Sequence, residues 1–546
     1  MAGPRLRLFA IIALLIDNVS GHQLPSVLTP TAQQQTLMPN AVKLLSDAEP
    51  CALFFDLDAF EDGLIQIKTH FMPGTLHAIA MKANPLSACL LLARDHGFGC
   101  EVASPCELEH ALRLGFQPER IVMDSPAKTR RDLRAALTAG VRLNADNFEE
   151  LERIDDILRD EFGGGGRLGG GSCRSCIGLR INPQHGEGGI AATGTIAPTS
   201  KFGVALMDFH AELIECFRRY AWLECIHCHV GSQGCEQALL VRAVRTVLEL
   251  ADEIDSAVGA RQIQSLDIGG GMPVDYASDV ADEEAGPERV TAASYAAALR
   301  SEVPALFDAC SRRSLVTEFG RCISAKCGLM VSRVEYTKCA GGRRIASVHC
   351  GADLFLRTAY RPSDWPHRVS AWNGEGRFLQ PSTECADPMW DIVGPLCFRG
   401  DIVAQEVRLS EQLKSGMVIC VHDAGAYTIG MFSKVSSHSL RTLDNVLVRF
   451  TCTAQRIPPM SIACIPDGHR LCSLSMWGDR LHHGHSTTLA SRHPYMVYVT
   501  VVVLWQRSPT AKRWTKRFEC GVYPFAPSRS GDHHVLRQLL PQRSPE

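Results

Sequence analysis

Lys82 is the residue in this sequence whose type and position first suggest covalent chemistry. It follows a short apolar run with strand character, residues 76–81, and an Ala-Asn-Pro sequence ends the strand directly afterwards. A lysine held at the end of a buried strand is desolvated, which lowers its pKa and makes its amine a nucleophile toward aldehydes. Taken alone, the position is more typical of a lysine that extends from a strand end into solvent. The interpretation therefore depends on the residues that accompany Lys82.

Other residues that can bind anions or transfer protons follow further strand-like runs. They are Glu101, Arg180, His229, Ser232, Glu318 and Arg321. One more run ends in three glycines, Gly269, Gly270 and Gly271. Such glycines let backbone N–H groups approach a phosphate closely, and Arg321 offers a bidentate fork for the same group. A phosphate site together with a strand-end lysine suggests a phosphate-bearing aldehyde cofactor, pyridoxal 5′-phosphate (PLP).

The elements between these residues alternate between strand and helix patterns. Strands are predicted at residues 76–81, 99–103, 121–124, 141–144, 177–181, 223–229, 265–268 and 315–318. Helices are predicted at residues 105–114, 129–139, 148–160, 204–220, 236–258 and 292–309. Eight such units over about 250 residues predict an α/β fold, a TIM (β/α)8 barrel, whose functional groups lie at the C-terminal ends of the strands. A doubly wound open sheet is less favoured because no Gly-x-Gly-x-x-Gly turn is present.

The chain is expected to contain five regions. Residues 60–325 form the PLP-binding barrel, interrupted by a flexible glycine-rich insertion at 163–171. Strand-like runs replace helices after residue 326, which predicts a C-terminal all-β domain over 326–439. Residues 22–59 comprise a linker and the first strand of that domain. Residues 1–21 resemble a targeting segment, and residues 440–546 are an atypical extension in which 496–505 has strand character.

The N-terminal segment has the pattern of a cleavable targeting peptide. Arg5 and Arg7 precede nine apolar residues, 8–16, and small residues follow at 19–21. This pattern suggests the secretory pathway or import into an organelle such as a plastid. Nine apolar residues are too few to span a bilayer, so no membrane partner is expected.

Composition is that of an ordinary globular protein. The 546 residues are 45% hydrophobic and 21% charged, with a formal net charge of −3, which gives no indication of a nucleic-acid partner. The 22 cysteines are scattered, so we interpret most of them as buried thiols. Cys225, Cys228 and His229 match a haem-attachment pattern, and Cys173 and Cys176 could complete a zinc site with them. Both are disfavoured, the first because it lies inside a predicted barrel and the second by spacing, and no metal is expected.

Nine stretches carry a family resemblance, and they occur in family order over most of residues 50–438. They read AMKANP, EVASPCELEHAL, LRIN, SKFG, HCHVGSQ, LDIGGG, EFGR, GPLCFRGD and DAGAY. The sequence resembles the fold-type III PLP-dependent decarboxylases, the group of ornithine, arginine and diaminopimelate decarboxylases. HCHVGSQ, LDIGGG and GPLC are most similar to the diaminopimelate enzymes.

The resemblance implies a set of roles. Lys82 would hold PLP, His229 would stack on its ring, and Glu318 would pair with the ring nitrogen. Cys397 would reach into the active site of a partner subunit and protonate the substrate Cα, which implies a homodimer. The remaining residues implied to bind the cofactor, chiefly its phosphate, are Glu101, Arg180, Ser232, Gly269, Gly270, Gly271, Gly320, Arg321 and Tyr427.

The substrate expectation also comes from the resemblance. Arg357 resembles the arginine that holds the distal carboxylate of diaminopimelate, with Tyr360, Arg321 and Tyr427 as further substrate-binding residues. The expected reaction converts meso-diaminopimelate to L-lysine and CO2, in lysine biosynthesis. Phe398 departs from the family pattern, because an acidic residue that pairs with the distal ammonium usually stands there. Alternatives are an ornithine-, arginine- or lysine-type or D-amino acid decarboxylase, or a decarboxylase-like regulatory protein that has lost catalysis.

Overall fold

A computed structural model of the chain describes residues 30–164, 172–186, 188–278, 289–308, 313–381 and 389–431, together with strand segments at 446–451, 463–464, 470–477, 496–504 and 517–518. The expected targeting segment lies outside the described residues, as do nearly all of the glycine-rich insertion and most of residues 440–546. The chain divides into two units, Met1–Thr453 and Ala454–Glu546.

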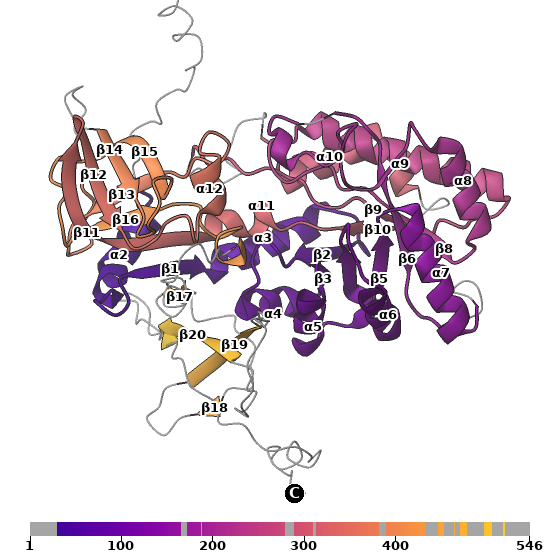
Figure 1. Cartoon of the computed structure of the whole chain (residues 1–546), viewed down its shortest axis with the longest axis horizontal. Helices are drawn as coiled ribbons and strands as arrows, with labels where there is room; N and C mark the ends of the chain where they lie inside the picture. Colours follow the sequence, from indigo (N-terminus) through magenta and orange to yellow (C-terminus); the bar gives the residue numbers. More distant parts are fainter. Residues whose placement is uncertain are drawn as a thin grey trace, which may run out of the picture. The chain divides into compact units, whose positions relative to one another are not determined.

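A closed parallel barrel forms one part of the first unit (Figure 1). Its strands are β2 (Leu76–Ala80), β3 (Gly99–Val102), β4 (Ile121–Asp124), β5 (Arg142–Ala145), β6 (Ile177–Asn182), β8 (Leu223–His227), β9 (Ser265–Asp267) and β10 (Ser314–Thr317). The strand order is β5-β4-β3-β2-β10-β9-β8-β6, and pairing of β5 with β6 closes the ring. Closure confirms the predicted TIM barrel and rules out the open doubly wound sheet.

Helices cover the outside of the barrel, and their starts follow local sequence signals. They are α3 (Leu57–His70), α4 (Ser87–Asp95), α5 (Pro105–Arg113), α6 (Arg130–Ala139), α7 (Phe148–Phe162), α8 (His210–Arg219), α9 (Gln237–Val258) and α10 (Ala292–Glu302). Ser104 caps α5 by accepting a hydrogen bond from the Glu107 N–H, and Pro105 occupies the first turn. Thr129 and Asp132 form a capping box at the start of α6.

One helix prediction was wrong at its start. The segment predicted as a helix over 204–220 begins with a two-residue strand, β7 (Val204–Ala205), and the helix α8 starts only at His210. β7 pairs with the end of β6 through Ile181 and Val204, outside the barrel ring. Val204 is β-branched and buried, which favours its place in this short strand over a place in a helix.

The second part of this unit is a curled, mainly antiparallel sheet. Its strands are β1 (Cys51–Asp56), β11 (Gly328–Ala340), β12 (Arg343–Val348), β13 (Val369–Trp372), β14 (Met389–Val393), β15 (Ile402–Arg408), β16 (Val418–Val421) and β17 (Val446–Thr451). β11 is central, because it pairs with β1, β12 and β16. Short helices α2 (Ala32–Leu44), α11 (Arg321–Ser324) and α12 (Leu356–Tyr360) accompany it.

The remaining elements are short. Single turns of 3-10 helix lie at η1 (Pro118–Arg120), η2 (Ala191–Thr193), η3 (Pro304–Phe307), η4 (Ala325–Cys327) and η5 (Ile429–Met431). The second unit contains β18 (Ala463–Cys464), β19 (Arg470–Trp477), β20 (Met496–Leu504) and β21 (Arg517–Phe518). β19 and β20 pair antiparallel, and β20 confirms the strand expected at 496–505.

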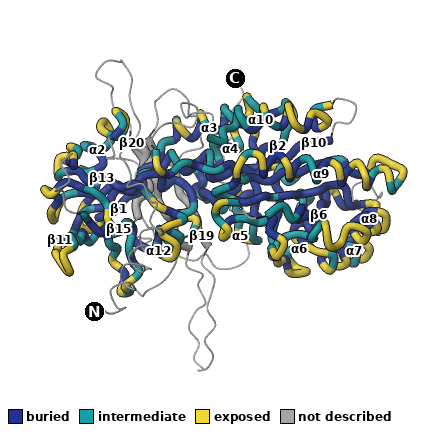
Figure 2. Tube along the Cα trace, turned by 90° about the horizontal axis from the view of Figure 1, so that it is seen from above, coloured by how far each residue is buried: buried dark blue, intermediate teal, exposed yellow. Residues whose placement is uncertain are grey.

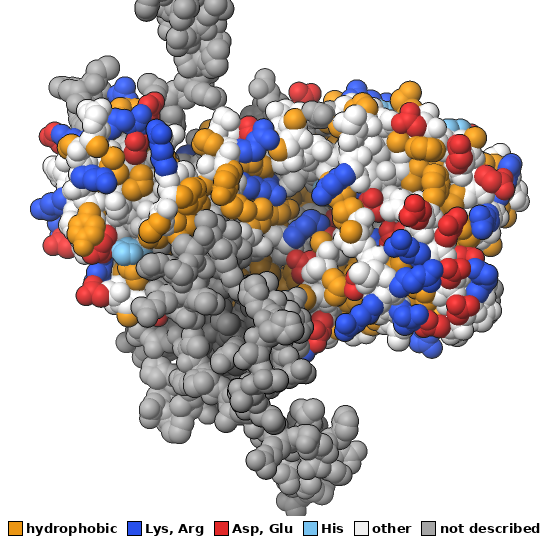
Figure 3. All heavy atoms as spheres, viewed as in Figure 1, with side chains coloured by type: hydrophobic (Ala, Val, Ile, Leu, Met, Phe, Trp, Pro, Cys, Tyr) orange, Lys and Arg blue, Asp and Glu red, His pale blue; other side chains and the backbone are white. Residues whose placement is uncertain are grey.

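The barrel strands are the buried interior of the first unit, whereas α7 and α8 expose much of their length (Figure 2). Acidic and basic side chains intermingle over the barrel helices on the face seen in Figure 3. Most of the cysteines among the described residues are buried thiols, as the composition suggested. None of the described helices combines the length and apolar character that crossing a membrane requires.

Candidate active site

A pocket opens at the C-terminal ends of the barrel strands, where the fold predicts functional residues. Its lining comprises Ala80, Lys82, His229, Gly231, Ser232, Gly271, Met272, Glu318, Phe319, Gly320, Arg321, Cys322 and Tyr427. The tertiary structure therefore brings eight of the predicted site residues to one pocket, from segments that lie as far apart in sequence as Lys82 and Tyr427.

Lys82 lies two residues beyond β2 and is half-buried at the barrel mouth. Its Nζ donates to Glu101 Oε1, and Glu101 is fully buried on β3. Burial alone would lower the pKa of Lys82, but the carboxylates of Glu101 and Glu318 raise that pKa above its usual range. The lowered pKa expected from the sequence is therefore wrong for the free side chain, because the sequence did not show which acids face it.

Glu318 follows β10 and directs a nearly unpartnered carboxylate into the site. It is 2% exposed, and neither of its carboxylate oxygens has a hydrogen-bond partner among the described residues. His229, from the loop after β8, accepts a hydrogen bond at Nδ1 from the Gly270 N–H at 3.0 Å. Burial lowers the pKa of His229, so its ring is neutral and offers a flat face rather than a charge. The tautomer with hydrogen on Nε2 follows from the Gly270 contact.

The glycines after β9 allow a close approach of backbone segments. A Cβ at Gly269, whose φ is 63°, would lie 2.7 Å from His229 Nδ1. A Cβ at Gly270 would lie 2.6 Å from the backbone oxygen of Glu318. Any larger residue would therefore push this loop away from His229 and Glu318, so the glycines set the shape of the site.

Arg321 begins α11 directly after β10 and is 4% exposed. Its Nη2 donates to Ser232 Oγ at 3.0 Å, its Nε donates to the Ser232 backbone oxygen at 3.0 Å, and its Nη1 donates to Tyr276 Oη at 2.7 Å. The guanidinium also lies 4.3 Å from the ring centroid of Tyr427 and 4.6 Å from that of Trp365. These contacts place two of the predicted phosphate-binding residues, Ser232 and Tyr427, against the Arg321 guanidinium.

Arg357, on α12, lies beside the same rings. Its guanidinium is 4.5 Å from the ring centroid of Tyr427 and 4.7 Å from that of Trp365. Its Nη1 is buried and has no hydrogen-bond partner among the described residues. Burial and the charge of Arg321 lower the pKa of Arg357. Two neighbouring cations with a free donor form a site for an anion.

Seven predicted residues lie outside the pocket lining, namely Glu101, Gly269, Gly270 and Arg357, described above, and Arg180, Cys397 and Tyr360. Arg180 is buried within the barrel, where Nη1 donates to Asp124 Oδ2 at 3.0 Å. Cys397 is exposed on the loop between β14 and β15. Tyr360 is 62% exposed, and its ring stacks on that of Phe398 with centroids 6.2 Å apart.

Sequence reasoning missed several residues that contact the site. Tyr276 and Trp365 hold Arg321, and no motif marks either of them. His227 lies two residues before His229 and contacts Asp124 and Glu318. Its signal was available, because residue alternation along the predicted strand 223–229 puts His227 and His229 on the same face. Among the described residues, Asp124, His227 and Glu318 are the one cluster of metal-ligand type, so the cysteine pairs considered for zinc form no such group.

Comparison with known proteins identifies the class. Residues 57–325 match the family described as pyridoxal-dependent decarboxylase, pyridoxal binding domain. A diaminopimelate decarboxylase from Pseudomonas aeruginosa is 30% identical over 369 residues, covering 66% of this chain and 79% of that protein. One from Archaeoglobus fulgidus is 29% identical over 367 residues, with coverage of 66% and 79%.

Solved structures share the same architecture. The crystal structure of diaminopimelate decarboxylase from Helicobacter pylori complexed with L-lysine has a TM-score of 0.60 and 26% identity, and the match covers 72% of this chain and 90% of that one. A lysine/ornithine decarboxylase from Vibrio vulnificus complexed with putrescine, at 19% identity and a TM-score of 0.59, shows the fold alone and covers 77% and 99%.

The chain belongs to the fold-type III PLP-dependent decarboxylases and is an enzyme of that class. The pocket fits PLP, since it combines a lysine amine, a flat neutral imidazole, a buried carboxylate without a hydrogen-bond partner among the described residues, and a cradle that a Cβ would fill. Bound PLP supplies a pyridine ring that withdraws electrons from the substrate Cα as CO2 leaves.

Proposed function

We propose that this decarboxylase acts on meso-diaminopimelate and produces L-lysine and CO2, a step of lysine biosynthesis. The observation that carries the proposal is the buried Nη1 of Arg357, which has no hydrogen-bond partner among the described residues. A carboxylate at the far end of the substrate would accept from this donor and reduce the repulsion between Arg357 and Arg321. Lysine and ornithine carry an ammonium there and no carboxylate, so the two arginines would repel them.

The relatives support the same substrate. The proteins from Pseudomonas aeruginosa and Archaeoglobus fulgidus are diaminopimelate decarboxylases, and the Helicobacter pylori structure holds L-lysine, the proposed product. These similarities of about 30% identity support a shared reaction, and Arg357 supplies the physical reason for it.

Within this proposal each side chain has a defined task. Lys82 binds the cofactor through its amine, and Glu101 holds that amine in position. His229 would pack on the cofactor ring, and Glu318 would accept a hydrogen bond from the ring nitrogen of the cofactor. Arg321 and Ser232 would bind its phosphate near Gly271. Hydrogen bonds already hold Lys82, His229, Arg321 and Ser232 in the protein, which reduces the entropic cost of binding.

We further propose a homodimer in which each active site is completed by the partner subunit. Cys397 is exposed and does not line the pocket of its own chain. A thiol is a workable acid near neutral pH, so Cys397 of one subunit would give its proton to the substrate Cα in the other. The neighbouring stacked pair of Phe398 and the 62% exposed Tyr360 presents aromatic surface of the kind found at subunit interfaces.

A second substrate class follows from Phe398. Its ring stacks on Tyr360 and offers no negative charge to a distal ammonium. This arrangement favours an amino acid whose far end carries a carboxylate but a less basic amine. The two candidates differ in the group that sits beside Phe398, so direct competition between substrates separates them.

The deciding experiment is product analysis with the purified protein, PLP and meso-diaminopimelate. We expect equal amounts of CO2 and L-lysine, and a much lower rate with L-lysine or L-ornithine as substrate. Absence of lysine from a protein that binds PLP would contradict the substrate proposal and leave the decarboxylase class intact. Testing amino acids that carry a distal carboxylate and a less basic distal amine would then address the second class.

A further inference from the structure

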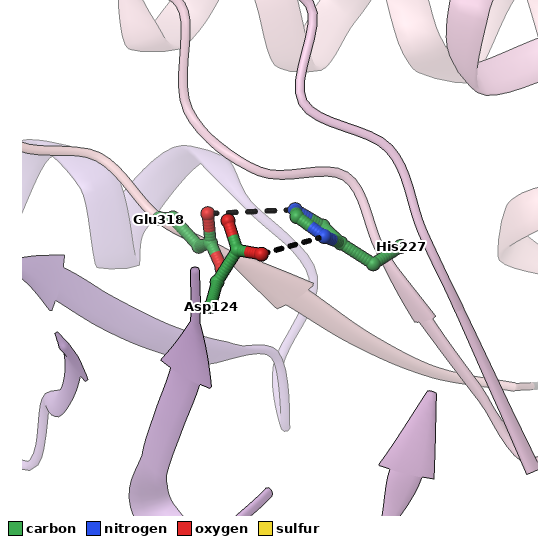
Figure 4. A group of neighbouring side chains, drawn as sticks. All are labelled: Asp124, His227 and Glu318. Carbon is green, nitrogen blue, oxygen red and sulfur yellow. Dashed lines mark ion pairs between the residues drawn. The ribbon is translucent and has the colours of Figure 1, made fainter. Parts of the chain in front are cut away.

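His227 faces the carboxylates of Asp124 and Glu318, with one ring nitrogen directed at each (Figure 4). It ends β8, is 0% exposed and lies between two carboxylates from different strands. Its Nε2 is 3.6 Å from Glu318 Oε2, and its Nδ1 is 3.7 Å from Asp124 Oδ1. Both separations are those of ion pairs rather than hydrogen bonds, and neither ring nitrogen has a hydrogen-bond partner among the described residues.

The chemistry of the two neighbours determines the state of this ring. A neutral imidazole has one donor and one acceptor nitrogen, so it would direct a lone pair at one of the two carboxylates. A protonated imidazole donates from both nitrogens and matches both acceptors. We propose that His227 is a positioning residue. Its ring is protonated and lies between Asp124 and Glu318, and it thereby holds Glu318 ionised and oriented for the ring nitrogen of PLP.

The other acids around His227 have partners of their own, so Glu318 is the carboxylate that depends on the positive charge of His227. Asp124 on β4 already pairs with Arg180 on β6. On β9, Asp267 accepts a hydrogen bond from the Gly269 N–H at 3.0 Å. In the next layer, Lys82 after β2 binds Glu101 on β3, and His229 is neutral.

The electrostatics agree with this geometry. Burial alone would lower the pKa of His227, but Asp124 and Glu318 raise it to about 9. Burial alone would raise the pKa of Glu318, but His227 and the other nearby cations bring it well below its usual range. Glu318 therefore stays ionised at neutral pH, which favours a protonated ring nitrogen beside it.

The consequence for the enzyme is that His227 stabilises the ionised Glu318, and Glu318 in turn stabilises the protonated ring nitrogen. A pyridine nitrogen that keeps its proton withdraws electrons more strongly than a neutral one. Glu318 touches that nitrogen, whereas His227 acts only through Glu318. The inference rests on PLP binding by this family and is independent of whether the substrate is diaminopimelate.

The test measures the protonation of the cofactor directly. Holoenzyme is prepared with PLP labelled with nitrogen-15 in the ring, and the resonance of that nitrogen is recorded by NMR for the wild type, Glu318→Gln and His227→Gln. We expect a protonated nitrogen in the wild type and a shift toward the unprotonated position in both variants. Activity of His227→Gln should fall about 10- to 100-fold, as is common when a supporting residue behind a cofactor ligand is lost.

His77 provides a matched control, because it is also a buried histidine of a barrel strand. Its Nδ1 is 2.8 Å from Thr317 Oγ1, and burial lowers its pKa to about 4, so it is neutral. His77→Gln should leave the cofactor nitrogen protonated. If His227→Gln also leaves it protonated while Glu318→Gln does not, the role of His227 is refuted and that of Glu318 stands. If neither variant changes it, both assignments fail.

Asp124→Asn tests the same role should His227→Gln fold poorly. It keeps the shape of the cluster and removes one of the two carboxylates that hold the His227 proton. We expect the cofactor nitrogen to lose its proton at lower pH than in the wild type, and an unchanged titration would contradict the proposal. A stoichiometric divalent ion in the purified wild type, absent from Asp124→Asn, would show that a metal and not a proton lies between these side chains, and it would overturn the proposal.

Discussion

At the scale of single residues, the chemistry depends on charges that the fold leaves partly uncompensated. Arg321 and Arg357 share the faces of Tyr427 and Trp365, and Arg321 has polar partners whereas Arg357 Nη1 has none. A buried donor without a partner costs about 1–3 kcal/mol, which a ligand carboxylate would recover on binding. The cost is therefore an indication of what the pocket binds.

Replacing Arg357 tests this at the same scale. Arg357→Gln removes the charge but keeps a polar side chain, so kcat/KM for meso-diaminopimelate should fall about 10- to 100-fold, mainly through KM, since a charge-assisted hydrogen bond contributes about 1.5–3 kcal/mol. Steady-state kinetics with varied substrate would measure the change.

Arg361→Gln is the matched control, because Arg361 lies one helical turn further along and its ion pair with Asp364 is more than half exposed on the arginine side. Exposed pairs contribute little, so this variant should behave as the wild type. Equal loss in both variants, or an unchanged KM in Arg357→Gln, would contradict a role of Arg357 in binding the distal carboxylate.

At the scale of elements, the site depends on loops that leave neighbouring strands and meet at short distances. The loop after β9 touches both His229 and Glu318, which follow β8 and β10. Parallel strands of a barrel place such loops on one face, and the glycines permit their contact. The position of each side chain is thus set by the packing of three loops rather than by any one of them.

Gly270→Ala should disturb this packing. The added methyl would lie 2.6 Å from the Glu318 backbone oxygen, so the loop must shift and the hydrogen bond to His229 must weaken. Overpacking of this kind typically costs about 1–3 kcal/mol, and we expect PLP to bind about tenfold or more weakly. Titration of the apoenzyme with PLP measures the affinity.

Gly374→Ala serves for comparison, since the nearest heavy atom to its added methyl is 3.9 Å away. That variant should bind PLP as the wild type does. Normal PLP affinity in Gly270→Ala would show that the loop has more freedom than these contacts imply.

At the scale of the whole molecule, the position of Cys397 is the feature that a single chain leaves unexplained. The loop that carries it is well anchored, because the buried Asp401 carboxylate accepts from the backbone N–H groups of Leu396 at 2.5 Å and Ala352 at 2.6 Å. A loop held this firmly presents its exposed thiol in a fixed direction. We propose that the Cys397 thiol faces the active site of a second copy of the chain.

Complementation tests the shared site. Lys82→Ala and Cys397→Ala should each be nearly inactive, but coexpression in equal amounts should restore about a quarter of wild-type activity. Half of the random dimers are then mixed, and each mixed dimer contains one intact site. The purified mixture is assayed for CO2 release.

Cys339→Ala, which alters another exposed cysteine, should be fully active alone and should reach about half of wild-type activity when coexpressed with Lys82→Ala. A Lys82→Ala and Cys397→Ala mixture that remains as inactive as its components would contradict the proposed sharing.

Much of this molecule was predictable because its signals are local. Hydrophobic runs located the barrel strands to within about two residues, since the periodicity of strands and helices can be read directly from the order of residues. The residue types at the strand ends then gave Lys82, His229, Glu318 and Arg321, because a TIM barrel directs those ends to one face. The start of α8 was missed because the pairing of β7 with β6 is a contact between distant segments.

The sequence by itself determined the fold class, the cofactor and the residue types of the pocket. The tertiary structure alone decided their electrostatics. It showed that burial would lower the pKa of Lys82 but that Glu101 and Glu318 outweigh burial and raise it. It also showed that Arg180 binds Asp124 and that His227 lies between two acids. The physical reason is that a pKa depends on burial and on distances of a few ångströms between groups from different strands, and sequence order does not contain those distances.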